Sequence, residues 1–425
     1  MGRELEVQGL PVSALAEEFG TPLFVYDGDV LGNQFRELRA LLHPRVEMFF
    51  SLKANPNIAI CALLRSLGAR AEVSSLAELI TARRAGVAAR DIIFPGPGKS
   101  SAELAACLDE DIYAIVCESL GELAEIDRLA AERHVRARVA LRVNPNFTTK
   151  GQKLTMSGRS RQFGIDEDQL MANTELGRRF PSVDLVGIHV YMGTRILDGH
   201  VIAENTGLIL DLAEYLSEKI GFPLKMIDIG GGLGVSYFDG EADLDIAPLT
   251  EGLNKIVDRF SVRNPDTRLI MELGRYLTAP AGVYIMRVRY VKESMGERFA
   301  IVDGGTHHHM AAVGIGSFVK RNFPMRLVNR TADAPGELWN IAGPLCTPND
   351  TLGHKVTMPE IRPGDLIGVF QSGAYGPTAS PVLFLSHGYP AEVLVRDGIP
   401  HIVHERHSPE DLLRGQRIPG DIPAT

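Results

Sequence analysis

Residues 46–75 read VEMFFSLKANPNIAICALLRSLGARAEVSS and contain the repeating unit of the fold. An apolar run at 46–54 is followed by a stretch of helical period at 58–68, and a second apolar run begins at residue 69. A strand, a helix and a second strand that lacks polar alternation are typical of a parallel sheet buried on both faces.

The same unit recurs along the chain. Apolar runs begin at residues 46, 69, 91, 114 and 138, so successive starts are separated by 23, 22, 23 and 24 residues. Three more runs begin at 185, 226 and 269, and longer helical stretches such as 203–219 separate them. Eight units between residues 46 and 275 predict a (β/α)8 barrel, a fold that typically has about 250 residues. The alternative is an open doubly wound sheet, which seldom carries eight regular units in succession.

The pattern changes after residue 281. Strand-like runs without regular helices between them occur at 283–291, 298–305, 337–343, 365–375 and 391–405. The last run contains Asp397-Gly398, a hairpin signal between alternating apolar residues. The segment LFVYD at 23–27 is a candidate strand of the same β-rich part. We therefore predict a barrel domain over residues 28–281 and a β-rich domain formed by residues 1–27 and 282–425.

Composition excludes several classes of protein. The chain has 425 residues, 45% hydrophobic and 23% charged, which is a globular balance rather than a disordered one. Its net charge is −9 and it has no basic run, so nucleic acid and membranes are not expected partners. Four cysteines without a CxxC motif, and an N-terminus without a signal sequence, predict a reducing, cytoplasmic location.

Polar residues fall where the barrel strands end, which is where catalytic groups of such barrels lie. Lys53 ends the first run, either as a paired structural lysine or as a reactive amine. Gly230-Gly231-Gly232 follows the seventh strand, either as a tight turn or as a phosphate cradle. Glu272 ends the eighth strand, and its interpretations are a salt bridge with Arg275 or a bond to a cationic ring nitrogen.

Two further groups lie in the β-rich part. Cys346 is in the turn-rich stretch GPLCTPND, with Asp350 four residues on, so exposure and function are favoured slightly over an inert buried thiol. His307, His308 and His309 are consecutive, and consecutive residues on a strand alternate faces. Only two of them could share a site, so no metal site is predicted.

The barrel residues together match the needs of pyridoxal 5'-phosphate. This cofactor requires an amine to bind it covalently, backbone amides for its phosphate, and a carboxylate that keeps its ring nitrogen protonated. Lys53, the glycine triplet and Glu272 supply these groups in strand order.

With these motifs, the chain resembles the fold-type III pyridoxal-phosphate decarboxylases, the family of diaminopimelate and ornithine decarboxylases. The likeness runs from about Thr21 to Pro390, and the motifs keep the family order. The resemblance implies an alanine racemase-like barrel with a β-rich domain, and a head-to-tail homodimer whose active sites are shared between subunits.

The resemblance also assigns residues. Lys53 matches the cofactor lysine, and Glu72 and Ser75 match an acidic and a small residue beside the cofactor. The remaining cofactor-binding matches are Gly230, Gly231, Gly232, Glu272, Gly274, Arg275 and Tyr375, with Leu273 in place of the family's proline. Cys346 matches a catalytic cysteine donated by the partner subunit. Arg275, Thr347, Asp350 and Tyr375 are the expected substrate-binding residues.

The departures bear on the substrate. Tyr191 replaces a histidine that stacks on the cofactor ring, and Thr194 replaces a phosphate-binding serine, so both changes preserve the role. Thr347 replaces the acidic residue that reads a distal ammonium in these decarboxylases. The stretch THHHMAAVG, which includes Ala311, lacks the substrate arginine of diaminopimelate decarboxylases.

This pattern is similar to a subgroup of secondary-metabolite and exosortase-associated decarboxylases. Its best-understood type, from butirosin assembly, acts on a glutamyl group carried by an acyl carrier protein. Lys320 and Arg321 are candidates for contact with such a carrier, although a solvated face is favoured slightly for them.

We therefore expect α-decarboxylation of an amino acid, free or carrier-bound. Three alternatives stay open: a meso-diaminopimelate decarboxylase, an amino-acid racemase on the same fold, and a binding protein without catalytic activity.

Overall fold

The computed structural model describes residues 4–148, 154–155, 157–314, 321–330 and 336–420. The chain divides into two compact units, Val30–Ala279 and a second unit formed by Met1–Asp29 with Pro280–Thr425. Each unit is described by itself. Within the described residues, no helix is long and apolar enough to cross a membrane.

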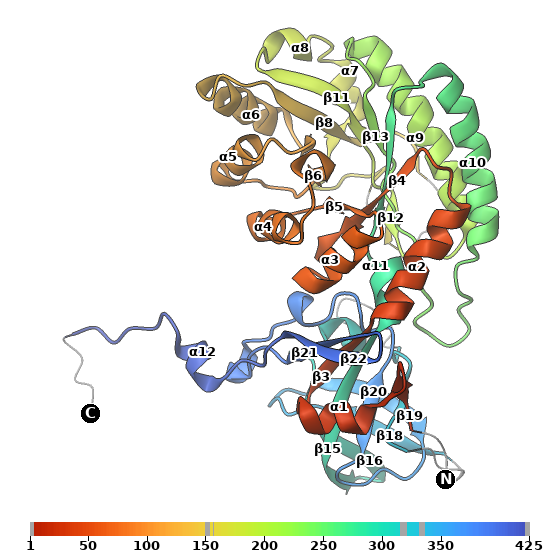
Figure 1. Ribbon diagram of the computed structural model, residues 1–425, viewed down its shortest axis with the longest axis vertical. Helices are drawn as coiled ribbons and strands as arrows, with labels where there is room; N and C mark the ends of the chain where they lie inside the picture. The colour runs from red at the N-terminus through yellow and green to blue at the C-terminus, as the bar shows by residue number, and fades with distance from the viewer. Residues whose placement is uncertain (1–3, 149–153, 156, 315–320, 331–335, 421–425) are drawn as a thin grey trace. The chain divides into compact units, whose positions relative to one another are not determined.

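The first unit is a closed barrel of eight parallel strands with helices around it (Figure 1). The strands are β4 (Val46–Ser51), β5 (Arg70–Glu72), β6 (Ile92–Phe94), β7 (Ala114–Cys117), β8 (Ala137–Asn144), β11 (Val183–His189), β13 (Met226–Asp228) and β14 (Arg268–Leu273). Parallel pairing of β7 with β8 and of β14 with β4 closes the ring. The predicted barrel is therefore confirmed, with all eight strands inside the runs found in the sequence or within two residues of them.

Helices surround the barrel, and several of them begin at capping residues in the loops that follow the strands. The helices are α2 (Gly28–Leu41), α3 (Ile58–Ser66), α4 (Leu76–Arg84), α5 (Ser101–Asp109), α6 (Leu120–Glu132), α7 (Glu167–Met171), α8 (Leu176–Arg179), α9 (Gly199–Ile220), α10 (Ile246–Arg263) and α11 (Arg275–Thr278). Ser75, Ser100 and Ser119 each accept a backbone N–H in the first turn of α4, α5 and α6. Such caps stabilise a helix start by about 1 kcal/mol each and fix where the strand–helix loop ends.

The interior of the barrel is packed with apolar side chains. A fully buried cluster takes residues from most of the strands: Phe49, Ile93, Ala114, Val116, Ala140, Val186, Met226 and Ile270. Toward the strand starts, Arg268 pairs with Glu47, and Arg70 pairs with both Glu47 and Asp91. These contacts fill the middle and one end of the barrel, so polar chemistry is left to the carboxyl ends of the strands.

The second unit is built on a mixed sheet that is mainly antiparallel, in which β21 with β3 and β16 with β18 are the described parallel pairs. It contains β3 (Leu23–Asp27), β15 (Gly282–Ser294), β16 (Glu297–Val302), β17 (Met325–Leu327), β18 (Glu337–Ala342), β19 (Thr351–Met358), β20 (Leu366–Val369), β21 (Ala391–Arg396) and β22 (Ile399–His404), with the short β1 (Glu6–Val7) and β2 (Leu10–Pro11). β3 pairs with β15 and with β21, so the N-terminal segment at 23–27 is part of this sheet. Asp397 and Gly398 both have positive φ and form the tight turn between β21 and β22.

Three features of this unit were not anticipated. The strands β17 and β19 and the short helices α1 (Val12–Glu18) and α12 (Pro409–Leu413) lie outside the predicted elements. The expectation that the triplet His307–His309 lies on a strand is wrong, because β16 ends at Val302 and the chain turns there. The alternation argument therefore does not apply to these histidines.

The barrel core provides a test of the fold. Phe49 is fully buried, so Phe49→Ala removes a ring from the centre of the barrel and leaves a cavity. We expect the free energy of unfolding of the barrel to fall by about 3–5 kcal/mol, measured by urea titration. Val262→Ala on α10 is the control, because Val262 is 84% exposed and its loss should change the value by less than about 0.5 kcal/mol. An equal effect of both changes would contradict this description of the core.

Candidate active site

Lys53 lies at the carboxyl end of β4, between two carboxylates. The strand runs directly into a short 3-10 turn, Leu52–Ala54, in which the residues on either side of Lys53 are buried. The Nζ atom of Lys53 is 2.9 Å from Glu72 Oε2 and 3.5 Å from Glu272 Oε2, and the lysine side chain is 38% exposed. The amine is thus paired with two acids and partly exposed, and its reactivity stays a prediction.

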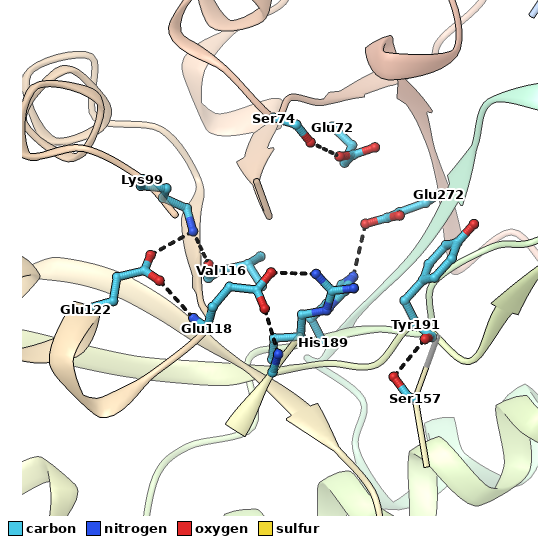
Figure 2. Close-up of polar contacts among 12 residues, drawn as sticks. Glu72, Ser74, Lys99, Val116, Glu118, Glu122, Ser157, His189, Tyr191 and Glu272 are labelled. Atoms are coloured by element: carbon cyan, nitrogen blue, oxygen red, sulfur yellow. Dashed lines mark hydrogen bonds and ion pairs between the residues drawn. The ribbon is translucent and has the colours of Figure 1, made fainter. Parts of the chain in front are cut away.

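Glu72 is the last residue of β5 and is fully buried. Ser74 donates its Oγ proton to Glu72 Oε1 at 3.0 Å (Figure 2). Ser75, the small residue singled out in the sequence, instead caps α4 by accepting the backbone N–H of Glu78. The place of Ser75 beside the cofactor stays a prediction, and the serine that contacts the acid is Ser74.

Glu272 ends β14 and faces His189, the last residue of β11. His189 Nε2 is 3.1 Å from Glu272 Oε1, and both side chains are 2% exposed (Figure 2). Burial acts to raise the pKa of Glu272, but the charge of Lys53, the hydrogen bond from His189 and the charge of Arg142 outweigh it and hold this pKa below its ordinary value. Glu272 is therefore an ionised carboxylate inside the barrel.

Asp228 ends β13 next to this pair and behaves differently. It is fully buried, and its Oδ1 accepts the backbone N–H of Gly230 at 2.9 Å. Burial and the neighbouring charge of Glu272 raise the pKa of Asp228 well above its ordinary value. Two adjacent buried acids thus take opposite protonation states, as expected when like charges share one site.

The glycine triplet forms a turn that side chains would fill. A Cβ atom on Gly231 would lie 1.7 Å from the carbonyl oxygen of Glu272, and one on Gly232 would lie 2.3 Å from that of Gly193. Gly230 and Gly232 also have positive φ. The turn therefore packs its bare backbone against the end of β14 and against β12 (Gly193–Thr194), which contains Thr194.

Tyr191 joins these groups. Its ring centre is 5.5 Å from Lys53 Nζ, and its backbone carbonyl accepts the Ser157 hydroxyl at 2.9 Å (Figure 2). A Cβ atom on Gly230 would lie 3.0 Å from the Tyr191 ring. The structure thus brings together Lys53, Glu72, Tyr191, Glu272 and the glycine turn, which were separate motifs in the sequence.

Arg275 follows on the other side of Glu272. Gly274 lies where a Cβ atom would be 2.8 Å from Ala54 Cβ, so it lets the end of β14 approach the turn that contains Lys53. The contact described for Arg275 is a hydrogen bond from its Nη1 to the Tyr237 hydroxyl at 2.8 Å, and the salt bridge with Glu272 stays an untested alternative. Arg195 lies nearby, with its guanidinium carbon 5.2 Å from the same ring and an ion pair to Glu241.

The remaining predicted residues belong to the β-rich unit. Cys346 is the exposed cysteine of the chain, whereas burial raises the pKa of Cys61, Cys107 and Cys117 to about 12. Thr347 is half-buried next to it, and Tyr375 is half-buried in the loop after β20. Their roles, and their relation to the barrel residues, stay predictions.

Asp350 has a structural function that the sequence did not reveal. It is 3% exposed, and its Oδ1 accepts the backbone N–H of Thr306 while its Oδ2 accepts that of Leu345. The carboxylate therefore joins the Cys346 loop to the loop after β16. Both oxygens are engaged within the protein, so its predicted contact with substrate has no support from the described hydrogen bonds.

The three consecutive histidines are buried and uncharged. Burial is the main cause that lowers the pKa of His307, His308 and His309 to about 4, 2 and 3. The His308 ring contacts the Tyr284 hydroxyl and the Gly388 carbonyl, and His309 contacts Ser372. These contacts are those of core histidines rather than of ligands.

Sequence reasoning missed His189, Asp228, Ser74 and Arg142. Each of the first two ends a barrel strand, which is the signal that identified Lys53 and Glu272. One ligand atom each from His189, Asp228 and Glu272 lies within 4.8 Å of the others, a spacing that a metal ion could also use. However, His189 Nε2 and Glu272 are already at hydrogen-bond distance, and the amine of Lys53 is a poor neighbour for a cation.

The residues fit pyridoxal phosphate. Lys53 is the reachable amine, Glu272 is an ionised acid that can partner a protonated ring nitrogen, and the glycine turn and Thr194 offer small, polar groups for a phosphate. In addition, His189 Nδ1 and Asp228 Oδ2 are buried and lack a hydrogen-bond partner within the described ranges. The fold and this donor set define a barrel enzyme of the pyridoxal-phosphate class.

Comparison with known proteins agrees. A family model described as the pyridoxal-binding domain of pyridoxal-dependent decarboxylases matches residues 29–279. The chain belongs to this family, so it is a carboxy-lyase that uses pyridoxal 5'-phosphate, and the resemblance found in the sequence is confirmed.

Individual relatives span nearly the whole chain. An L-glutamyl-[BtrI acyl-carrier protein] decarboxylase from Niallia circulans is 41% identical over 95% of this chain and 96% of its own length. A diaminopimelate decarboxylase from Aquifex aeolicus is 31% identical over 95% and 94%. The solved diaminopimelate decarboxylase of Helicobacter pylori in complex with L-lysine superimposes with a TM-score of 0.85 at 27% identity, covering 95% of this chain and 98% of that one.

The glycine turn generates a prediction about cofactor binding. Gly231→Ala places a methyl group against the backbone of Glu272, so the strand end must shift. We expect the affinity of the apoprotein for pyridoxal phosphate to fall about tenfold or more, followed by titration of the visible absorbance of the bound cofactor. Gly177→Ala is the matched control, because a Cβ atom there meets nothing within 4 Å. Unchanged affinity in Gly231→Ala would show that the turn does not support the cofactor.

Proposed function

We propose that this protein removes the α-carboxylate of an amino acid held through its side chain by a carrier protein, with a glutamyl group as the best match. The observation that carries the proposal is the 41% identity, over nearly the full length of both chains, to a decarboxylase named for such a substrate. The uncharged Thr347 supports it, because a linked side chain has no distal charge to be read. A site without such a charged reader would disfavour a free zwitterion, whose second end must also lose water.

The barrel residues bind the cofactor in this proposal. Pyridoxal phosphate, when bound, supplies an electron sink for the bond to the departing carboxylate. Lys53 would hold the cofactor through its amine, and Glu72 would orient this lysine. Glu272 keeps the ring nitrogen protonated, and Tyr191 covers the ring face.

The phosphate is assigned to Thr194, the Gly230–Gly232 turn, Arg275 and Tyr375. Small residues and a turn of backbone amides suit an anion that must approach closely. Tyr237 holds the Arg275 guanidinium in place through a 2.8 Å hydrogen bond, which suits a group that aims at phosphate or at the substrate carboxylate.

Cys346 is assigned as the general acid that delivers a proton to the substrate Cα atom after carbon dioxide leaves. We propose that it acts from the second subunit of a cytoplasmic homodimer, and that the pyridoxal-binding domain spans residues 28–281. Its exposure distinguishes it from the three buried cysteines of the chain.

A second candidate is the decarboxylation of free meso-diaminopimelate. It is favoured by the 31% identity to the Aquifex aeolicus enzyme and by the fold shared with diaminopimelate decarboxylases in complex with L-lysine. In that case other side chains must read the distal ammonium and carboxylate.

A substrate panel separates these functions. Carbon dioxide release is measured with glutamyl-carrier protein, free glutamate, meso-diaminopimelate, ornithine, lysine and arginine. We expect release from the carrier-bound substrate alone, because the site lacks a charged reader at position 347. Rapid release from free diaminopimelate would overturn the carrier-bound assignment, whereas racemisation without carbon dioxide would overturn decarboxylation itself.

The role of Cys346 is tested by removing its thiol. We expect Cys346→Ala to bind cofactor normally and to lose about 10²-fold or more in turnover, the usual contribution of a positioned acid. Cys107→Ala, which removes a buried thiol outside the site, should retain turnover.

Mixing gives a sharper test of the shared site. Lys53→Ala and Cys346→Ala are each inactive, but random reassortment of their subunits should restore about a quarter of wild-type activity, since half the dimers then contain one intact site. No recovery on mixing, with subunit exchange verified, would contradict donation of Cys346 by the partner.

A further inference from the structure

His189 is held in the barrel between three ionisable neighbours. It ends β11, where its register partners are Arg142 on β8 and Asp228 on β13. Its side chain is 2% exposed, and its Nε2 is 3.1 Å from Glu272 Oε1. Backbone pairing on both sides therefore fixes the position of the ring relative to Glu272.

The hydrogen-bond pattern determines the tautomer of this ring. Glu272 is ionised and can only accept, so the proton must be on His189 Nε2. His189 Nδ1 has no hydrogen-bond partner in the part of the chain that the structure describes. The described contact of the ring is therefore the one hydrogen bond that Nε2 donates to the carboxylate.

The neighbours of this pair are already engaged. Glu118 accepts hydrogen bonds from Arg142 and from the backbone of Gly164, and Asp228 Oδ1 accepts from Gly230. Lys53 approaches the other oxygen of Glu272, Oε2, at 3.5 Å. Without His189, Oε1 would be a buried anionic oxygen with no hydrogen-bond donor described for it, and such an oxygen rotates or takes up a proton.

We propose that His189 is a positioning residue for the cofactor: it holds Glu272 ionised, with one oxygen directed to the ring nitrogen. This rests on the proposed role of Glu272 and adds a group that acts only through it.

Two amide substitutions separate this role from mere packing. In His189→Gln the amide nitrogen reaches the place of Nε2 and can still donate to Glu272. In His189→Asn the amide reaches only the place of Nδ1, so the pocket stays polar but the carboxylate loses its donor. Both variants are smaller than histidine and neutral, so a purely structural role predicts similar losses for the two.

The measurements are made on the apoprotein and the reconstituted enzyme. Affinity is measured by titration with pyridoxal phosphate, and the protonation of the ring nitrogen is read from the NMR shift of 15N-labelled cofactor. We expect His189→Asn to bind about tenfold or more weakly, to move the ring signal toward the unprotonated form, and to lower kcat with little change in KM. His189→Gln should stay within about threefold of wild type.

A double-mutant cycle with Glu272→Gln tests whether His189 acts through the acid. If it does, His189→Asn should have less than about threefold further effect on cofactor affinity in the Glu272→Gln background. Equal losses in the Asn and Gln variants, an unchanged ring signal in His189→Asn, or effects that multiply in the double variant would each overturn the proposal. A silent Glu272→Gln would remove the assignment of Glu272 itself, which is a separate failure from that of His189.

Discussion

The pairing of one partly exposed amine with two buried carboxylates is the constraint around which the barrel site is arranged. An ammonium group among strand ends must be compensated, and Lys53 has Glu72 and Glu272 within 3.5 Å. Two acids for one amine leave an excess of negative charge. A third acid nearby, Asp228, adds little to this excess, because its raised pKa favours its neutral form. Hydrogen bonds from donors such as Ser74 and His189 stabilise the two carboxylates.

This arrangement is suited to a cofactor that brings its own charge. An ionised Glu272 inside an apolar barrel is a site prepared for a cationic ring. The tight turn at Gly230–Gly232 and Glu272 fix each other's position, because the backbone of Gly231 packs on the carbonyl of Glu272. Electrostatics and packing therefore meet at the end of a single strand, β14.

Much of the barrel and part of its site could be predicted from the sequence. Strand spacing identified all eight strands, and the position of Lys53 and Glu272 at strand ends identified the two central groups. The contacts of His189, Asp228 and Arg142 could not be predicted, because they depend on the register between β8, β11 and β13, which strand periodicity does not determine. The contact of Ser74 with Glu72 has a similar cause, since one position along the chain decides whether a hydroxyl contacts this acid, as in Ser74, or caps a helix, as in Ser75. The His307–His309 triplet was misread because the turn residues Asp303, Gly304 and Gly305, which end β16, were taken as part of the strand.

The hydrogen bonds of Asp350 bear on how this site can evolve. Its carboxylate ties down two loops by their backbone amides, so the path of the chain around Cys346 does not depend on the side chains in between. The side chain at position 347 can then be substituted while the thiol beside it keeps its position. In the proposed assignment, single substitutions in this loop could change the substrate during evolution and leave the chemistry unchanged.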